Sequence, residues 1–337
     1  QSLEQITMIA DQRPAQPLDF AVIGNGLNNG LQALIARRAG QDLSKEIGRV
    51  FFHGIWLALI IATAGVVITQ TAAPAILRAA IHDNEISAQA ISFLRIRIFG
   101  LPLLYLYVMR NALLVGTNQT RLLVWGTLAE AVTNIVLDYG LIYGKLGMPE
   151  IGFNGAAYAS IIAEGTGLIV IYAVIHFKGI HKRFALFEDT KWDGALARHI
   201  LIKSSPLIAQ FTISIITWEY FYILIEHHGE RSLAISNTMR NIFGLFGIFS
   251  WAFAATANTM VSNIIGQGRE GEVMGLVSKI VRCSFAFALL LFLLLNFWPE
   301  WFLSFYGQSE GFIRDAIPVV RVVSIALLMM SFGPVWL

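Results

Sequence analysis

Long apolar segments dominate the pattern of hydrophobic and polar positions along the chain. A helix needs about 20 apolar residues to cross the ~30 Å hydrocarbon core of a bilayer. Eight segments reach that length: Gly48–Leu77, Ala90–Val115, Leu122–Tyr143, Gly155–Phe177, Ile200–Glu226, Ala234–Ile265, Leu276–Leu303 and Ile313–Leu337. Phe20–Arg38 is a weaker ninth because glycine and asparagine interrupt it, and Leu3–Ala10 is too short to cross. Uninterrupted runs favour helices over barrel strands, so we predict an all-α polytopic membrane protein with about nine to ten helices.

Composition supports lipid as the main solvent of the chain. Hydrophobic residues make up 56% and charged residues 14%, which leaves too little polar surface for a water-soluble globule of 337 residues. The net charge of +2 gives no indication of nucleic acid as a partner. Cys283 is the only cysteine, so no disulfide framework or thiolate cluster is expected. No cleavable signal peptide is visible, and we expect a monomer in the bilayer.

Lysine and arginine predict the orientation. They concentrate in alternate connections, at 37–49, 116–121, 178–203 and 266–282, whereas the intervening connections carry few. Positive loops face the cytoplasm, so we predict these four as cytoplasmic loops of a multi-pass protein in the cell inner (plasma) membrane. The long basic connection then serves as an amphipathic linker, 178–199, between an amino-terminal lobe, 1–177, and a carboxy-terminal lobe, 200–337.

The two halves repeat. Ala39-Gly40-Gln41 resembles Ile265-Gly266-Gln267, and Phe93-Leu94-Arg95-Ile96 resembles Val319-Val320-Arg321-Val322. Both pairs are offset by 226 positions (266 − 40 and 321 − 95). A common offset favours two copies of one helical unit, as in transporters whose two lobes rock about a central site.

One predicted helix carries a polar face. Glu130, Asn134 and Asp138 recur every four residues, which stacks them along one side of Leu122–Tyr143. An ionisable group costs roughly 2.5–3.5 kcal/mol at the centre of a spanning helix, so it usually faces a cavity or a partner. Two carboxylates and an amide suit a proton or a small cation. The alternative is a set of polar contacts between helices.

Other ionisable residues fall within predicted helices. Glu219 lies beside aromatic residues, and an acid among rings suits organic cations, although the rings also fit packing or an interfacial belt. Glu164 fits either a substrate cavity or a hydrogen bond between helices. For Arg95 and Arg97 the favoured interpretation is snorkelling toward the interface. The side chains assigned to a substrate cavity are Glu130, Glu164, Trp218, Tyr220 and Tyr222.

A family pattern extends over most of the chain. The order and spacing of several motifs resemble the multidrug and toxic compound extrusion (MATE) family: Phe93-Leu94-Arg95 with Gly100 and Pro102, Arg110-Asn111, Gly116-Thr117-Asn118-Gln119-Thr120, Asn134 with Asp138, and Tyr143-Gly144 through to Gly155-Ala156-Ala157. The resemblance implies twelve helices in two lobes, with substrate leaving through a V-shaped cavity as protons or sodium ions enter.

The resemblance also implies roles for single residues. Asp138 and Asn134 match the acid and amide of the family's amino-terminal cation site, and Asn111 matches an amide from the preceding helix. Glu219 resembles a coupling carboxylate of the carboxy-terminal lobe, and Asp11 an acid of the first helix. Their offset is 208 (219 − 11) rather than 226, so we expect 18 positions of the family pattern (226 − 208) to be absent before Gly40. The last two helices of the pattern are expected to be absent too.

We therefore predict an antiporter, driven by protons or sodium, that exports amphipathic and often cationic compounds. It needs no cofactor beyond the coupling ion, and no metal other than sodium at Asp138. The alternatives are a lipid-linked glycan flippase of the same superfamily and a truncated, inactive copy. An intramembrane enzyme is disfavoured because no nucleophile, metal cluster or paired acid and base occurs at a working spacing.

Overall fold

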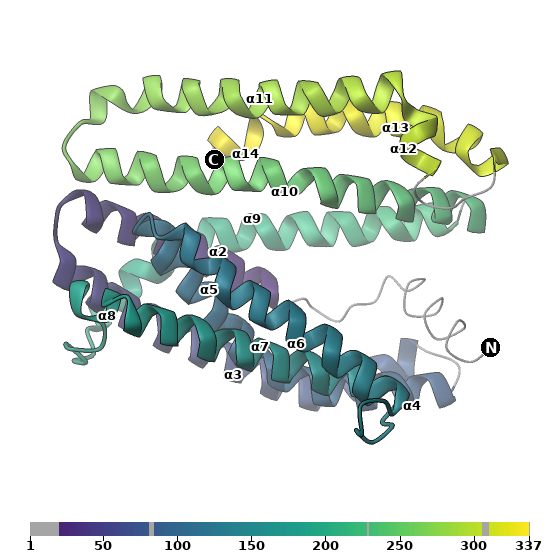
Figure 1. Ribbon diagram of the computed structural model, residues 1–337, viewed down its shortest axis with the longest axis horizontal. Helices are drawn as coiled ribbons and strands as arrows, with labels where there is room; N and C mark the ends of the chain where they lie inside the picture. Colours follow the sequence, from purple (N-terminus) through teal and green to yellow (C-terminus); the bar gives the residue numbers. More distant parts are fainter. Residues whose placement is uncertain (1–19, 81–83, 228, 305–309, 337) are drawn as a thin grey trace. The chain divides into compact units, whose positions relative to one another are not determined.

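A computed structural model describes residues 20–80, 84–227, 229–304 and 310–336, which are helical with short connections and contain no strand. The amino-terminal helices are α2 (Ala21–Gly40), α3 (Ser44–Ala80), α4 (Asn84–Arg97), α5 (Leu101–Gly116), α6 (Leu123–Tyr143), α7 (Phe153–Phe177) and α8 (Ile180–Arg183). They are followed by α9 (Gly194–Glu226), α10 (Glu230–Gly266), α11 (Val273–Phe297), α12 (Pro299–Ser304), α13 (Glu310–Met330) and α14 (Gly333–Trp336). Figure 1 labels each of them.

Seven helical segments in the described part are long and apolar enough to cross a membrane: Ser44–Ala79, Asn84–Gly116, Phe153–Phe177, Gly194–Ile225, Arg231–Gly266, Glu270–Phe297 and Glu310–Trp336. They correspond to seven of the eight predicted crossings. The eighth, Leu122–Tyr143, is also a helix, but Glu130, Asn134 and Asp138 lower its mean hydropathy. The weak ninth, Phe20–Arg38, becomes helix α2. Helices satisfy their own backbone hydrogen bonds, which explains why the apolar runs adopt this form.

The described residues divide into two compact units, one up to residue 212 and the other from residue 213 onward. In the first unit, α2 packs against α3 and α5, and α6 makes its most extensive contact with α7. Their core is built from side chains such as Leu31, Phe51 and Tyr105. Small residues allow close packing: a β-carbon at Gly155 of α7 would lie only 2.7 Å from the carbonyl oxygen of Leu141 in α6.

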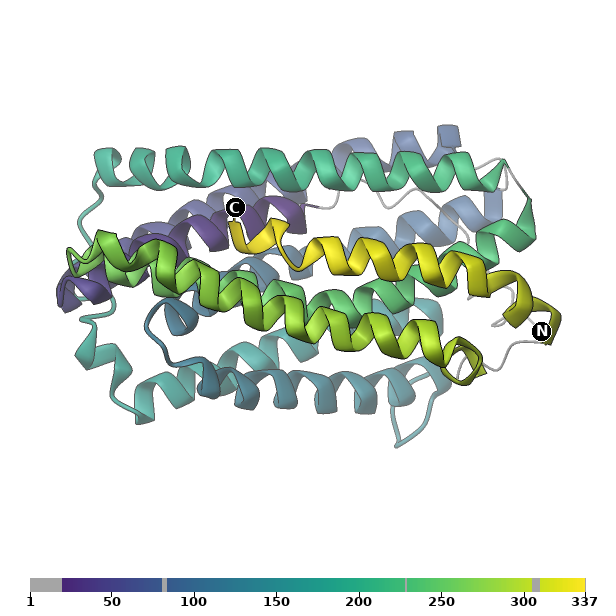
Figure 2. The same cartoon turned by 90° about the horizontal axis from the view of Figure 1, so that it is seen from above.

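In the second unit, α10, α11 and α13 pack on one another around apolar side chains such as Ile242 and Leu295. Figures 1 and 2 show α11 and α13 side by side from two directions. The boundaries of these helices follow the sequence repeat. Helices α2 and α10 end at equivalent positions of the repeat, with an offset of 226 (266 − 40).

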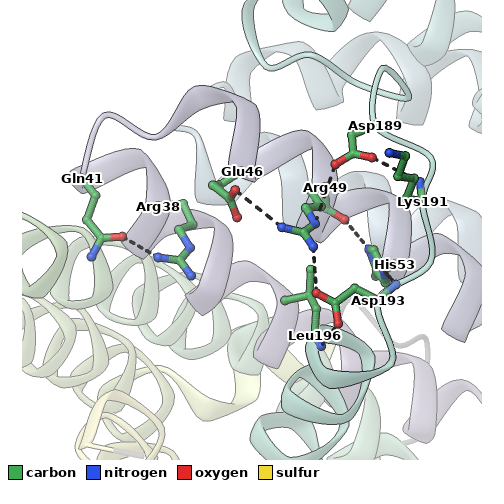
Figure 3. A network of polar contacts seen from close by, with 9 residues as sticks. All are labelled: Arg38, Gln41, Glu46, Arg49, His53, Asp189, Lys191, Asp193 and Leu196. Atoms are coloured by element: carbon green, nitrogen blue, oxygen red, sulfur yellow. Dashed lines mark hydrogen bonds and ion pairs between the residues drawn. The ribbon is translucent and has the colours of Figure 1, made fainter.

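The connection between α8 and α9 is attached to the first unit by a polar network (Figure 3). Arg49 of α3 donates to Asp193 at 2.7 Å, and the Oδ1 atom of Asp193 accepts the backbone N–H groups of Ala195 and Leu196 at 2.9 and 3.2 Å. Asp193 therefore caps the amino end of α9 and ties it to α3.

A buried histidine completes this network. The Nε2 atom of His53 accepts the backbone N–H of Asp193 at 2.8 Å, and its Nδ1 lies 2.7 Å from the carbonyl oxygen of Arg49. These two partners require the neutral tautomer with its proton on Nδ1. Trp192 stacks on the imidazole with ring centroids 5.1 Å apart. The start of α9 is thus held to α3 by an ion pair, a hydrogen bond and a ring contact.

The Asp193 network predicts a dependence of stability on pH. Backbone N–H groups of Leu196 and Ala195, and then Arg49, hold the pKa of Asp193 below its usual range. Its stabilising contribution is therefore present above the ordinary aspartate pKa of about 3.9, and is lost as pH falls through the lower folded value. We expect Asp193→Ala to lower the melting temperature at pH 7, with the difference from the unsubstituted chain disappearing at strongly acidic pH.

Thermal unfolding of the purified chain in detergent at several pH values measures this effect. Asp189→Ala is the matched control, because Asp189 lies 3.9 Å from the Nε atom of Arg49 and caps no helix. Equal melting temperatures for Asp193→Ala and the unsubstituted chain at pH 7 would contradict the assignment.

Candidate functional site

Three polar side chains line one side of α6, as the sequence predicts, but their surroundings differ. Glu130, Asn134 and Asp138 are all half-buried. The Oδ1 atom of Asp138 is buried and has no hydrogen-bond partner within the described residues. A buried acceptor without a donor costs free energy unless a proton or a cation occupies it. Asn134, one turn earlier, presents a neutral amide oxygen to the same face.

Glu130 lies where α6 crosses α7. A β-carbon at Gly167 of α7 would be 3.1 Å from the carbonyl oxygen of Gly126 and 3.3 Å from the Oε2 atom of Glu130. Two glycines therefore let the helix backbones approach closely. The Glu130 carboxylate sits beside this crossing.

A buried arginine occupies the other side of the crossing. Arg110 of α5 has no exposed surface, and its Nη1 atom would lie 2.8 Å from a β-carbon at Gly126. The guanidinium carbon stands 3.9 Å from the ring centroid of Tyr107, a cation–π contact. None of its three nitrogen atoms has a hydrogen-bond partner in the described part of the chain. Because Arg110 and Glu130 flank the same pair of glycines, the carboxylate provides negative charge close to the guanidinium.

Arg97 and Glu164 form an ion pair, which corrects the snorkelling interpretation of Arg97. The Nη2 atom of Arg97 donates to the Oε1 atom of Glu164 at 2.5 Å, and Nη1 donates to Oε2 at 3.4 Å. Glu164 is only 7% exposed on α7. Gly100 makes room for the pair, since a β-carbon there would be 2.7 Å from Oε2 of Glu164. The carboxylate of Glu164 therefore has an ion-pair partner, whereas no described residue donates a hydrogen bond to the Oδ1 atom of Asp138.

The remaining predicted residues are placed as follows. Asn111 is half-buried on α5, and the described residues include no hydrogen bond from it to Asn134 or Asp138. Glu219 is half-buried on α9, in the second compact unit. Asp11 lies outside the described residues. No cluster of three or more metal-ligating side chains occurs in the described ranges.

The aromatic residues of α9 have different surroundings. Tyr222 is 7% exposed, and its hydroxyl donates to the carbonyl oxygen of Ser236 at 3.1 Å. Trp218 stacks on Phe243 of α10, with centroids 5.7 Å apart. Tyr220, in contrast, is 61% exposed. Tyr222 and Trp218 thus pack α9 against α10, which agrees with the packing alternative that the sequence left open for these rings.

Sequence reasoning missed the surroundings of Arg110. The Arg110-Asn111 motif is visible in the sequence, but hydropathy does not tell which side of α5 faces the crossing of α6 and α7. The available signal is the glycine in each neighbouring helix, Gly126 and Gly167, which marks a close approach.

The profile of the MatE family matches residues 19–140 and 206–336, well over half of the chain. The chain belongs to the MatE family. It is 32% identical to "Probable multidrug resistance protein NorM" of Halalkalibacterium halodurans over 307 residues, which cover 82% of this chain and 66% of that protein. Its identity to the protein of the same name from Thermotoga maritima is 24%, over 88% of this chain and 63% of that protein. This MatE chain spans about half to two thirds of the length of the curated relatives it matches.

Solved structures show the same fold. "Crystal structure of MATE in complex with MaD5" matches with a TM-score of 0.85 and 19% identity, covering 97% of this chain and 73% of that one. "Outward-facing conformation of a multidrug resistance MATE family transporter of the MOP superfamily" matches with a TM-score of 0.82 and 20% identity, covering 94% and 70%. The two-lobe helical fold and the multi-pass membrane character predicted from the sequence are confirmed by this MatE membership.

The Arg97–Glu164 ion pair predicts an effect on the stability of the folded chain. This effect distinguishes a structural role for the pair from a role in cation coupling. Glu164→Gln leaves Arg97 without its anion among packed helices, so we expect the unfolding free energy to fall by roughly 1–3 kcal/mol. Replacing both residues by leucine removes both charges and should recover most of that loss. Unfolding in mixed detergent micelles, as a double-mutant cycle, measures the coupling.

The matched control is the ion pair of Arg231 and Asp315, which has the same 2.5 Å separation but side chains 62% and 50% exposed. Its coupling energy should stay within about 1 kcal/mol, because solvent screens it. A coupling energy for Arg97 and Glu164 no larger than that of the control would refute a structural role for the pair.

Proposed function

We propose that this chain forms the helical framework of a cation-coupled antiporter that exports amphipathic, often cationic, small molecules by alternating access. The names of its relatives refer to multidrug resistance, which supports this substrate class. The coupling ion is a proton or sodium, and the protein is a secondary transporter rather than an enzyme. We place it in the plasma membrane as a monomer with its basic loops in the cytoplasm.

The observation that carries the proposal is the buried Oδ1 atom of Asp138, which has no hydrogen-bond partner within the described residues. The three carboxylates in α6 and α7 are not equivalent. Glu164 is occupied by Arg97, and Glu130 lies at the glycine crossing of the two helices. Asp138 alone of these three combines a buried oxygen that lacks a donor with a neighbouring amide, Asn134, as a small hard cation requires.

Binding at Asp138 drives transport only if the cation favours one conformation over the other. A half-buried carboxylate provides such a bias, because neutralising it by a proton or sodium changes the cost of covering it with apolar residues. Glu219 is proposed to play the equivalent part in the second compact unit, with Asn111 and Asp11 completing the first site. The substrate is proposed to contact Tyr220 and Trp218.

The proposal predicts the effect of removing one charge. Asp138→Asn keeps the size of the side chain but cannot bind a proton or exchange a cation, so we expect gradient-driven ethidium efflux to fall at least about tenfold. Efflux from cells, with the proton and sodium gradients collapsed separately, measures this and identifies the ion. The experiment is run on this chain and, in parallel, on a full-length relative with the same substitution.

Glu150→Gln is the matched control, because Glu150 is an exposed carboxylate just beyond the end of α6. It should leave efflux unchanged. Undiminished, gradient-dependent efflux by Asp138→Asn would exclude Asp138 as the coupling residue. Absence of efflux under every gradient, with transfer of a labelled lipid-linked sugar across vesicles, would favour a flippase instead.

A further inference from the structure

A cavity with a volume of about 400 Å³ lies beside the last turn of α3 and extends along α4 from Asn84 to Ile96. Arg78 of α3 and Arg95 of α4 both line it, together with the hydroxyl-bearing Ser87 and Ser92 of α4. None of the described residues that line the cavity is acidic. The cavity belongs entirely to the first compact unit and is separate from the polar face of α6.

Two like charges share this cavity. Neither Arg78 nor Arg95 forms an ion pair or a side-chain hydrogen bond with another described residue. The backbone carbonyl of Arg95 accepts a hydrogen bond from Gln70 at 2.8 Å, which holds this turn of α4 against α3 without using the guanidinium. Guanidinium groups that converge on one cavity repel each other unless an anion lies between them.

A buried hydroxyl provides a second, independent sign of a ligand. Ser87 is only 4% exposed, and its Oγ atom has no hydrogen-bond partner within the described residues. It lines the same cavity. Ser92 is held in place by Asn154 of α7, whose Nδ2 donates to its Oγ at 3.0 Å, so the Ser92 hydroxyl proton remains available to an acceptor in the cavity.

We propose that this cavity binds a phosphate ester. Arginine presents a planar fork of donors that matches phosphate oxygens, and two hydroxyl donors complete a set suited to a tetrahedral anion. The volume admits a phosphate with its ester substituent, and Ile91 and Ile96 provide an apolar wall for that substituent. The ester comes from a phospholipid headgroup or from a soluble phosphate, because the recognition chemistry is the same for both.

The position of the cavity favours the lipid source. It begins where the apolar segment Ser44–Ala79 ends and Asn84–Gly116 starts, and continues along the second segment to Ile96. The ends of membrane-spanning helices meet the headgroup region. A bound headgroup would neutralise both guanidinium groups at a helix connection.

Binding is measured by native mass spectrometry of the purified chain with phosphatidylglycerol, diacylglycerol or glycerol 3-phosphate. We expect phosphatidylglycerol to bind and diacylglycerol, which lacks the phosphate, to bind at least about tenfold more weakly. The double variant Arg78→Gln/Arg95→Gln should lose about tenfold or more in phosphatidylglycerol affinity. Binding of glycerol 3-phosphate with the same loss in the variant would support the cavity and identify a soluble ester as its ligand.

Two further variants make the test decisive. Arg314→Gln/Arg321→Gln removes the same charge from exposed positions of α13, where Arg321 is the repeat counterpart of Arg95, and should not alter binding. Ala88→Leu keeps both arginines but fills the cavity from an exposed position of α4, and should weaken binding as the arginine variant does. The proposal would be overturned if diacylglycerol bound as tightly as phosphatidylglycerol. It would also be overturned if Ala88→Leu and Arg78→Gln/Arg95→Gln left phosphatidylglycerol binding unchanged, or if the control Arg314→Gln/Arg321→Gln lost as much affinity as the arginine variant of the cavity.

Discussion

The cost of placing a polar group in hydrocarbon governs this structure. Helices avoid this cost for the backbone, because each N–H and C=O forms its hydrogen bond within the same segment. Charged side chains have no such general solution, so each one requires a partner, an aromatic ring or access to a cavity. In the first compact unit, Glu164 has Arg97 and Arg110 has the ring of Tyr107, whereas Asp138 has a buried oxygen without a donor among the described residues.

These different solutions separate structural from functional charges. A paired carboxylate such as Glu164 holds helices together, and its charge is already compensated. A carboxylate whose buried oxygen lacks a donor has an unfavourable charge, so proton or cation binding there changes the energy of the whole conformation. Partners, rather than positions in the helix, distinguish the two roles, because Glu130, Glu164 and Asp138 all lie on the neighbouring apolar helices α6 and α7.

The sequence predicts most of the fold because hydropathy and the repeat are local patterns. Apolar run length indicates the crossings, and the offset of 226 positions between Gly40 and Gly266 is reproduced by the ends of α2 and α10. Partners across helices are not local. Arg97 and Glu164 are 67 positions apart, so no sequence pattern joins them, and snorkelling is the interpretation that the sequence supports for Arg97.

Asp138 is the best test of this account, because the sequence predicts its helix face and no described residue donates a hydrogen bond to its buried Oδ1 atom. Carbodiimide modifies protonated carboxyl groups in apolar surroundings, and mass spectrometry of peptides locates the adduct. We expect labelling of Asp138 that rises as the pH is lowered and, if sodium is the coupling ion, falls when sodium is added, with Glu164 protected by Arg97. Labelling of Glu164 together with an unreactive Asp138 would contradict the assignment of Asp138 as the carboxylate that exchanges a proton or a cation.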